Sequence, residues 1–372
     1  MRLTHLAITF TIKYDILQDI SISMQKKVLI HIIPKLTNGG AETVLTRLVE
    51  EFAKDGVEQF VISLQGNEND FNHAQIAGHC PVIHAKEDSS AVREIFLNNP
   101  EAKIVAWMYK SILKAHQWRS KFKTDHKIIW NIRRSSFRPK EIYQKASLFF
   151  FGIYSKWVKA SIIYCAFQAE IMHNHYGFYK GKSMVIQNRL AKKVELDSIG
   201  NSGIEGEYVL YVGRYNHAKG PDRLLDIAQM FLPKNPAFSL VIAGSGWTKA
   251  MIPSSLTKQV ILLGNVKELV PLYTYATALL FTSYTEGYPN VLVEAAVCGT
   301  PIIGFSAGDS PSILADHSLG ELVSSKTDFC RQLQQRIKTP PSLKERDDAS
   351  KMALTNFNFT QTYQAYHNFI FP

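Results

Sequence analysis

Residues 278–298 read ALLFTSYTEGYPNVLVEAAVC, and this stretch contains one complete β/α unit. It opens with the apolar run 278–281, passes through a loop that contains Gly287 and Pro289, and becomes apolar again after Asn290. A short continuous apolar run is typical of a strand buried on both faces. Because proline favours the first turn of a helix, the loop predicts a helix over 290–298. A strand followed at once by a helix is the repeating unit of a parallel α/β sheet.

The same alternation extends outward from this unit and forms two successive series. In the first series we predict strands at 28–33, 60–64, 104–107, 127–132, 162–165 and 184–187, and helices such as 43–53 and 167–175. In the second we predict strands at 208–212, 240–243, 260–263, 278–281 and 301–305, and helices such as 221–231. Two series predict an α/β fold of two doubly wound, Rossmann-like parallel-sheet domains. Since ligands bind outside the carboxyl ends of parallel strands, we expect the two sheets to face each other across a ligand cleft.

We place the domain boundaries where this alternation stops. Residues 1–23 do not share the alternation of the rest of the chain, and charged residues interrupt their apolar positions, so we interpret them as a non-core N-terminal extension rather than a signal peptide. A first domain is then expected over 24–203 and a second over 204–356, with a Gly- and Ser-rich seam between them. The aromatic, helix-like end, 357–372, is expected to pack back across that seam.

Composition excludes several classes of protein. The chain has 372 residues, of which 46% are hydrophobic and 20% charged, as is typical of a globular protein with two cores. Its four cysteines lie far apart and form no CxxC pair, which disfavours a disulfide scaffold and a zinc ribbon and favours a reducing, cytoplasmic compartment. No uncharged apolar run reaches the about 18 residues that a membrane-spanning helix needs.

The net charge of +10 is confined to the first half of the chain, and residues 101–160 contain 14 basic and 3 acidic side chains. Such a block attracts nucleic acid, anionic lipid or a phosphorylated substrate, or it is simply a solvated surface. We interpret it as a landing surface for an anionic membrane, at the inner face of the cytoplasmic membrane, and for a lipid-linked glycan. Nearby aromatic residues could assist or could instead pack in the core. These residues and the adjacent lysines are Phe149, Phe150, Phe151, Trp157, Lys156 and Lys159.

Two basic residues follow a predicted strand of the second series. Arg214 and Lys219 stand in the loop GRYNHAKG (213–220), just before a helix that Pro221 opens. A planar guanidinium and a compact ammonium group together suit a diphosphate, although they can also be two solvated loop cations.

Two carboxylates belong to the segment EGYPNVLVEA (286–295). Glu286 lies in the loop and Glu294 on the predicted helix, whose free amides face the carboxyl end of the sheet. Carboxylates held apart in this way can accept hydrogen bonds from hydroxyls of different sugar rings. The alternative for Glu294 is a structural partner where the helix packs on the sheet.

Glycines mark two more loops after strands. Gly39 and Gly40 precede a helix in the loop TNGGAE (37–42), where close backbone approach and free amides suit a phosphate or sugar hydroxyls, although a plain turn reads the same way. Gly244 belongs to AGSG (243–246), which lacks the third glycine and the acidic residue of a dinucleotide fingerprint and so disfavours a dehydrogenase.

These motifs, in this order, resemble glycosyltransferase family 4, the retaining, nucleotide-sugar-dependent enzymes of the GT-B fold. The resemblance covers about residues 26–370, and its specific part is the Glu286–Glu294 pair with seven residues between, combined with the GRYNHAKG and GGAE loops. It implies that Glu286 contacts the donor sugar, Glu294 the ribose, and Arg214 with Lys219 the diphosphate. The other donor contacts that it implies are Gly39, Gly40, Gly244, Val266, Gly287, Pro289, Asn290 and Val291.

The segments 106–110 (AWMYK) and 129–135 (IWNIRRS) also resemble members that build bacterial surface polysaccharide. Lys110 and Arg134 stand where many relatives have histidine, and Arg189 follows Asn188 where relatives often have glycine. These departures leave the donor sugar and the contacts next to it open. We take Lys110, Arg133 and Arg134 as acceptor or sugar-proximal candidates.

The resemblance implies a retaining hexosyltransferase. It would move a hexose or N-acetylhexosamine from a UDP- or GDP-linked sugar to a saccharide or lipid-linked saccharide in O-antigen, capsule or lipopolysaccharide synthesis. We expect no cofactor, no metal requirement and no nucleic-acid partner, because an Asp-x-Asp metal pair is absent and the basic residues form no recognisable recognition helix. The alternatives are a nucleotide-sugar epimerase of similar shape, a nucleic-acid-binding protein and an inactive, partner-binding homologue.

Overall fold

The computed structural model describes residues 27–37, 39–133, 142–189 and 200–372. The chain divides into two compact units, Met1–Ile128 and Ile129–Pro372. Among the described residues, no helix combines the length and the apolar character needed to cross a bilayer. The predicted extension 1–23 and residues 197–199 of the predicted seam, 197–206, lie outside the described residues.

The first unit is built on parallel strands that alternate with helices. Its strands are β1 (Val28–Ile33), β2 (Glu58–Ser63), β3 (Val82–His84) and β4 (Lys103–Trp107). Its helices are α2 (Gly40–Lys54), α3 (His73–Ala77), α4 (Ser89–Asn98) and α5 (Met108–Phe122). β1 lies between β2 and β4, with Ile32 opposite both Ile62 and Ala106. Every residue of β1 is buried, which explains why His31 is its only polar residue.

Three further strands belong to the same sheet as β1–β4. They are β5 (Lys127–Ile132), β6 (Ser161–Tyr164) and β7 (Ser183–Val185), accompanied by α6 (Ile142–Trp157) and α7 (Phe167–His175). Within the second unit, α6 contacts β5 where Phe151 meets Trp130 edge to face, with ring centroids 6.0 Å apart. The last helix, α14 (Phe359–Ile370), also contacts β5, because the buried Tyr366 is hydrogen-bonded to Asn131 at 3.0 Å.

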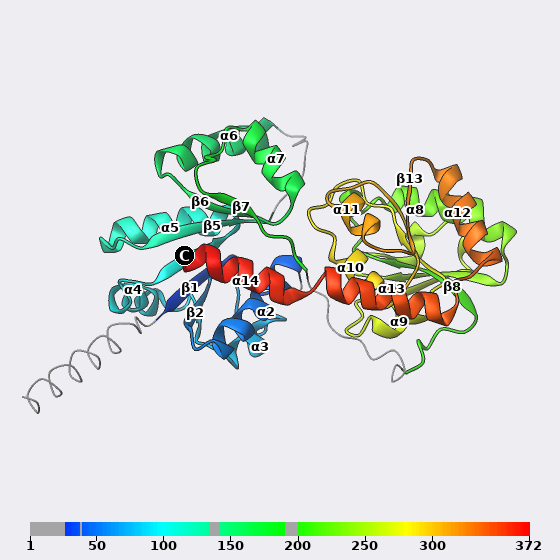
Figure 1. Cartoon of the computed structure of the whole chain (residues 1–372), viewed down its shortest axis with the longest axis horizontal. Helices are drawn as coiled ribbons and strands as arrows, with labels where there is room; N and C mark the ends of the chain where they lie inside the picture. Colours follow the sequence, from blue (N-terminus) through cyan, green and yellow to red (C-terminus); the bar gives the residue numbers. More distant parts are fainter. Residues whose placement is uncertain (1–26, 38, 134–141, 190–199) are drawn as a thin grey trace, which may run out of the picture. The chain divides into compact units, whose positions relative to one another are not determined.

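The second sheet lies wholly within the second unit. Its strands are β8 (Glu207–Val212), β9 (Phe238–Ala243), β10 (Val260–Gly264), β11 (Ala278–Phe281), β12 (Ile302–Phe305) and β13 (Gly320–Val323). The α-helices around it are α8 (Pro221–Phe231), α9 (Val270–Tyr275), α10 (Asn290–Val297), α11 (Ser310–Ala315), α12 (Lys326–Lys338) and α13 (Leu343–Asn356). Short 3-10 turns are η2 (His217–Lys219), η3 (Leu232–Lys234), η4 (Lys249–Met251) and η5 (Ser254–Leu256). α8 and α12 pack on one face of this sheet, and α9, α10 and α13 lie on the other (Figure 1).

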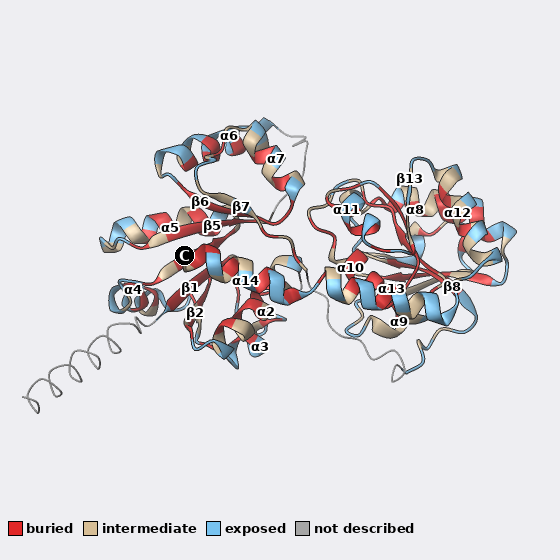
Figure 2. Ribbon diagram, in the orientation of Figure 1, coloured by how far each residue is buried: buried red, intermediate tan, exposed pale blue. Residues whose placement is uncertain are grey.

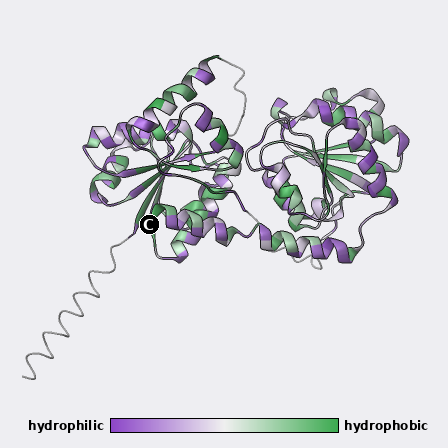
Figure 3. Cartoon of the chain, turned by 45° about the horizontal axis from the view of Figure 1, so that its top comes forward, coloured by the Kyte–Doolittle hydropathy of each residue, from purple (hydrophilic) through white to green (hydrophobic). Residues whose placement is uncertain are grey.

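Strand order identifies the architecture. The seven-stranded sheet runs β3-β2-β1-β4-β5-β6-β7 and the six-stranded sheet runs β10-β9-β8-β11-β12-β13. In each sheet the chain starts near the middle, moves to one edge and then returns to build the other side, which is the doubly wound, Rossmann-like order. The central strands of both sheets are largely buried and hydrophobic, whereas the edge strands are only partly buried (Figures 2 and 3). The predicted α/β class with two Rossmann-like sheets is therefore confirmed.

Candidate functional site

The candidate site lies at the carboxyl edge of the second sheet. β8 and β11 are neighbouring parallel strands, so the loops that follow them, 213–220 and 282–289, lie side by side. The backbone amides of Tyr284 and Thr285 both donate to the carbonyl of Ala218, at 2.8 and 3.2 Å. The two motif-bearing loops are thus joined through their backbones.

The structure brings Lys219 and Glu286 together. The Lys219 ammonium lies 2.6 Å from Oε1 of Glu286, and both side chains are largely shielded from solvent. The Ser283 hydroxyl donates to the same carboxylate oxygen at 2.7 Å. The carbonyl of Lys219 in turn accepts hydrogen bonds from the hydroxyls of Tyr211 and Thr282, at 3.3 and 3.1 Å. The ion pair is therefore held by both its backbone and its side chains.

Gly220 allows the two loops to approach this closely. It ends η2 and precedes α8 with a φ of 64°, in the left-handed region that favours glycine. A Cβ at this position would lie 2.1 Å from the carbonyl oxygen of Thr282. A side chain would therefore push the Lys219 loop away from the Glu286 loop.

Tyr284 forms a second connection between the loops. Its ring stacks on His217 with centroids 5.2 Å apart, and the guanidinium of Arg223 lies 3.8 Å from its ring centroid. Its hydroxyl donates to Asp222, and this contact raises the pKa of the Tyr284 hydroxyl. Sequence reasoning missed Ser283 and Tyr284, although both stand in the loop after β11, where residues of a site are expected.

Glu294 lies on α10 and is electrostatically connected to the same lysine. The Tyr273 hydroxyl donates to its carboxylate at 2.9 Å. Burial raises the pKa of Glu294, while the hydrogen bond from Tyr273 and the charge of Lys219 oppose that shift. Burial and the nearby Glu294 carboxylate raise the pKa of Tyr273. Lys219 thus interacts electrostatically with both motif carboxylates. No feature of the sequence indicated that Tyr273 would contact Glu294.

A second loop braces the segment between the two carboxylates. The amide of Asp309 donates to the carbonyl of Gly287 at 2.9 Å. Gly308 has a φ of +59°, and a Cβ there would lie 2.3 Å from the same Gly287 oxygen. Pro289 is buried as the N-cap of α10, and Val291 in the first turn is half-buried. The loop after β12 therefore fixes where α10 begins.

Asn290 is the first residue of α10. Its side-chain oxygen is buried and accepts no hydrogen bond from the part of the chain that the structure describes. An unsatisfied buried polar atom costs stability, and such atoms often belong to a site that a ligand completes. Together with the free amides of a helix N-terminus, this oxygen marks the start of α10 as a polar recognition point.

Arg214, Gly244 and Val266 follow β8, β9 and β10. Arg214 is exposed and makes no ion pair or hydrogen bond with the residues that the structure describes. Gly244 packs against the backbone of Gly213, because a Cβ on Gly244 would lie 2.2 Å from the Gly213 carbonyl oxygen. This contact explains the glycine without a ligand, and its donor contact stays a prediction. Val266 is half-buried, and its predicted base contact is likewise untested.

Three predicted residues belong to the first unit. Gly39 is the N-cap of α2 and Gly40 is its first residue, at the carboxyl end of β1. Lys110 is exposed in the first turn of α5, where it lines a hollow together with Lys86 and Lys114. Their roles in binding stay predictions.

Arg133 follows β5 and is tied into the protein. Its guanidinium donates to the Tyr366 hydroxyl at 3.1 Å and to the side chain of Asn188. These bonds connect the end of β5 to α14 and give Arg133 a structural role that sequence reasoning did not anticipate; a sugar-proximal role stays a prediction. Arg134 lies outside the described residues.

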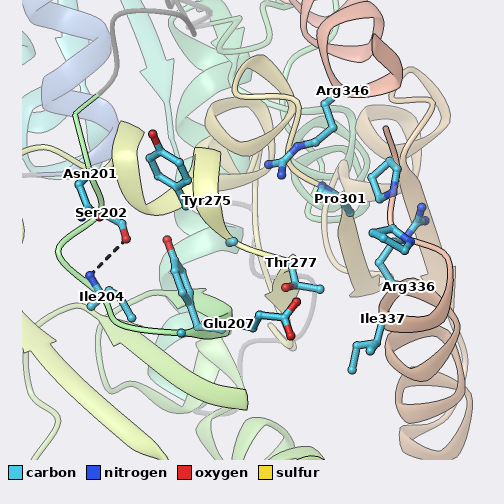
Figure 4. Close-up of a pocket in the computed structure, with 15 residues that line it drawn as sticks. Asn201, Ser202, Ile204, Glu207, Tyr275, Thr277, Pro301, Arg336, Ile337 and Arg346 are labelled. Carbon is cyan, nitrogen blue, oxygen red and sulfur yellow. Dashed lines mark hydrogen bonds between the residues drawn. The ribbon is translucent and has the colours of Figure 1, made fainter. Parts of the chain in front are cut away.

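A pocket with a different composition lies at the opposite edge of the second sheet (Figure 4). Glu207 and Thr277 line it at the amino-terminal ends of β8 and β11, together with Arg336. Arg346 is held there by the carbonyls of Gly299 and Thr274. Since a strand of this sheet is roughly 17–20 Å long, this pocket is separate from the Lys219–Glu286 cluster.

The sequence matches one family. Residues 195–353, which include every charged residue of the cluster, match the family described as "Glycosyl transferases group 1". A D-inositol 3-phosphate glycosyltransferase of Thermobifida fusca is 31% identical over 160 residues, which are 38% of this chain and 37% of that protein. An uncharacterized glycosyltransferase of Methanocaldococcus jannaschii is 23% identical over 218 residues, 55% of this chain and 53% of that protein. The chain thus spans about a third to a half of the length of these curated relatives.

Solved structures share the fold over nearly the whole chain. HepE from Anabaena, in complex with UDP-glucose, superposes with a TM-score of 0.72 at 16% identity and covers 92% of this chain and 98% of that one. The lipopolysaccharide outer core galactosyltransferase WaaB superposes with a TM-score of 0.66 at 18% identity and covers 93% and 99%. At such identities the likeness shows the fold alone. The two Rossmann-like sheets and these superpositions show that the chain has the GT-B fold, and residues 195–353 match the group 1 glycosyltransferase family.

Proposed function

We propose that the chain is a retaining glycosyltransferase that moves a hexose or N-acetylhexosamine from a UDP- or GDP-linked sugar to a saccharide or lipid-linked saccharide of a cell-surface polysaccharide. The observation that carries this proposal is the 2.6 Å ion pair between Lys219 and Glu286 at the carboxyl edge of the second sheet, with Glu294 nearby. The family match supports the sugar-transfer chemistry, and the UDP-glucose complex of HepE supports a nucleotide-sugar donor.

The diphosphate of the donor is proposed to bind Lys219 and Arg214. Glu286 neutralises Lys219 without a donor, and phosphate oxygens would compete for the same ammonium group. Arg214 is exposed after β8 and supplies a planar guanidinium fork for two oxygens. The first-turn amides of α10 add hydrogen-bond donors. Because phosphate charge grows as the sugar leaves, these groups stabilise the transition state more than the ground state.

The two carboxylates are proposed to bind opposite ends of the donor. Glu286, held by Ser283, accepts hydrogen bonds from hydroxyls of the transferred sugar once Lys219 turns to the diphosphate. Glu294, held by Tyr273, accepts hydrogen bonds from the ribose. Each carboxylate is oriented by a neutral hydroxyl, so its position persists when the charges around it change.

The transfer step needs little more than positioning. The acceptor hydroxyl attacks the anomeric carbon from the face that the diphosphate leaves, and the bond between that carbon and the phosphate oxygen breaks. The acceptor proton passes to an oxygen of the departing diphosphate, which leaves as the nucleoside diphosphate. Holding two substrates in register and stabilising the leaving group supply the rate enhancement. We propose that no metal is required, so that excess chelator leaves the rate unchanged.

A second acceptor class is favoured by one finding. Some relatives are named D-inositol 3-phosphate glycosyltransferases, and that name describes a phosphorylated acceptor. Lys86, Lys110 and Lys114, which line one hollow of the first unit, would suit an acceptor with a negative charge. The second candidate is therefore transfer to a small phosphorylated polyol.

A panel of radiolabelled UDP- and GDP-sugars, each with saccharide, lipid-linked and phosphorylated polyol acceptors, tests the proposal through hydrolysis or transfer. Lys219→Ala should lower kcat/KM by roughly 10²–10³, about 3–4 kcal/mol, because one charge contact to the leaving group is lost. Lys351→Ala is the matched control, since Lys351 forms an ion pair with Asp347 within α13 and lies outside the cluster. Near-normal kinetics of Lys219→Ala, or epimerisation without transfer, would contradict the proposal.

A further inference from the structure

Helix α6 has two apolar faces, and the residues that the structure describes cover one of them. Leu148, Phe151 and Gly152 are buried, and Phe151 packs on Trp130 of β5. The large apolar side chains that remain are between 53% and 86% exposed. They are Ile142, Tyr143, Phe149, Phe150, Ile153 and Trp157.

The exposed side chains form one continuous stripe. At 100° per residue they fall within an arc of about 120°, which lies opposite the buried face. Ring contacts join neighbours along the stripe, because the ring of Tyr154 stacks on Phe150 with centroids 5.9 Å apart and meets Trp157 at a tilt with centroids 5.8 Å apart. Figure 2 shows exposed segments along the length of α6. A contiguous apolar surface of this kind marks a binding face rather than scattered surface residues.

Positive charge borders the stripe. α6 contains no aspartate or glutamate, and Lys145, Lys156 and Lys159 are exposed along it and just beyond its end. Lys156, Lys159 and Lys180 line one hollow. The same helix belongs to the stretch 101–160 with 14 basic and 3 acidic side chains. A partner of α6 must therefore accept apolar and aromatic side chains and carry negative charge close to them.

We propose that α6 is the face on which the protein binds an anionic lipid bilayer. The helix lies in the plane of the interface, its stripe buried among the upper acyl chains and its lysines at the phosphates of the headgroups. Tyrosine, tryptophan and phenylalanine are the side chains that suit this boundary, because their rings are apolar and two of them carry a polar group. The proposal adds a location to the proposed function but does not depend on it, since the stripe and the lysines lie on a different sheet from Lys219 and Glu286.

The test uses the full chain with two kinds of vesicle, one containing phosphatidylglycerol and one of phosphatidylcholine alone. Binding is measured by co-sedimentation, and the fluorescence of Trp157 is measured with a lipid that carries a quencher high on its acyl chain. We expect binding that requires phosphatidylglycerol and weakens with salt. We also expect quenching that disappears in Trp157→Phe, because Trp107, Trp118 and Trp130 are buried and the half-buried Trp247 belongs to the second sheet's side of the chain.

Two sets of variants separate the contribution of the apolar stripe to membrane binding from that of the lysines. The double variant Phe150→Ser/Trp157→Ser should weaken binding roughly tenfold or more by removing buried apolar area. Lys156→Gln/Lys159→Gln should remove the preference for phosphatidylglycerol. Leu343→Ser, at the start of α13, is the matched control, because this side chain is as exposed as those of the stripe but lies on the second sheet. All are surface substitutions, so circular dichroism should show an unchanged fold.

Three outcomes would overturn the proposal. Binding that ignores the anionic lipid would remove the role of the lysines. Binding that Leu343→Ser weakens as much as Phe150→Ser/Trp157→Ser would show that the stripe is not the site. A lipid-free dimer that Phe150→Ser/Trp157→Ser dissociates in sedimentation velocity would show that a second copy of the chain covers α6. Because sugar transfer is not measured, none of these outcomes bears on the proposed function.

Discussion

At the scale of single residues, Gly220 tests how closely the two motif loops must approach. Gly220→Ala places a methyl group 2.1 Å from the Thr282 carbonyl oxygen, at a φ of 64°. We expect the variant to lose about 2–4 kcal/mol of unfolding free energy, because backbone strain adds to a clash that only loop movement relieves. Urea denaturation measures this loss.

Gly264→Ala is the control for that prediction. Gly264 has nearly the same φ, +65°, but a Cβ there meets nothing within 4 Å. Only the cost of a left-handed conformation remains, about 1–2 kcal/mol. Equal losses in Gly220→Ala and Gly264→Ala would show that the Thr282 contact is unimportant.

The pH dependence of the free energy of unfolding should reveal the cost of ionising the buried Glu294 carboxyl. Burial raises the pKa of this carboxyl in the folded protein, so folding favours its protonated form. Its ionisation therefore costs stability once the pH rises above the folded pKa, and the cost disappears as the pH falls through that value towards the unfolded value of 4.5. Glu294→Gln keeps an oxygen for Tyr273 to donate to and removes the charge.

We accordingly expect Glu294→Gln to be more stable than the wild type at neutral pH, with a difference that shrinks as the solution is acidified. Urea denaturation between neutral pH and the ordinary carboxyl range measures the difference. A variant that is less stable at neutral pH would mean that attraction to Lys219 outweighs the burial of the carboxylate.

At the scale of elements, burial decided which strands could be predicted. The runs 28–33 and 278–281 were predicted with the bounds that the structure has, because both are buried throughout and apolar except for His31. β3 and β13 were missed. They are edge strands of three and four residues without a fully buried face, so VIH and GELV carry no run that stands out from a loop.

The residues of the candidate site could be predicted only where the strand order alone brings them together. Lys219 and Glu286 follow neighbouring strands, so topology alone brings their loops together. The contacts of Tyr273 with Glu294 and of Arg133 with Tyr366 join residues 21 and 233 positions apart. Such pairs depend on how helices pack, and no local pattern encodes them. The sequence singled out the aromatic residues of α6 but left open whether they pack in the core or assist at a membrane, because an apolar helix has the same pattern whether one face or both faces are covered.

The contact of α14 with the first sheet depends on a buried hydroxyl. Tyr366→Phe keeps the ring but removes the hydroxyl that bonds the buried amide of Asn131 and the guanidinium of Arg133. We expect a loss of about 2–3 kcal/mol in unfolding free energy, because a buried amide and a charged donor lose the oxygen that they share. Tyr215→Phe, on an exposed ring, should change stability little. Equal stability of Tyr366→Phe and the wild type would show that α14 is held by apolar contacts alone.

At the scale of the whole molecule, the second sheet has a core of its own, in which α8 and α12 contribute Leu224, Phe231, Phe329 and Leu333. Net charge follows the same division, since the excess of basic residues lies in the first half of the chain. Two cores allow two unfolding transitions. A ligand that binds groups of one sheet should therefore stabilise that sheet first.

Calorimetry with UDP can test this independence and the location of the donor site at once. At a UDP concentration about 100 times its Kd, mass action should stabilise the sheet that binds it by about 2.7 kcal/mol, which raises one Tm by several degrees. We expect UDP to raise the Tm of the unfolding transition whose Tm Gly220→Ala lowers, because Gly220 and the proposed diphosphate site share the second sheet. The Tm that Tyr366→Phe lowers should stay unchanged when UDP is added. GDP replaces UDP if the donor carries guanine. If neither nucleotide moves a transition, the site is not at the second sheet; if all three perturbations move the same one, the two cores unfold as one.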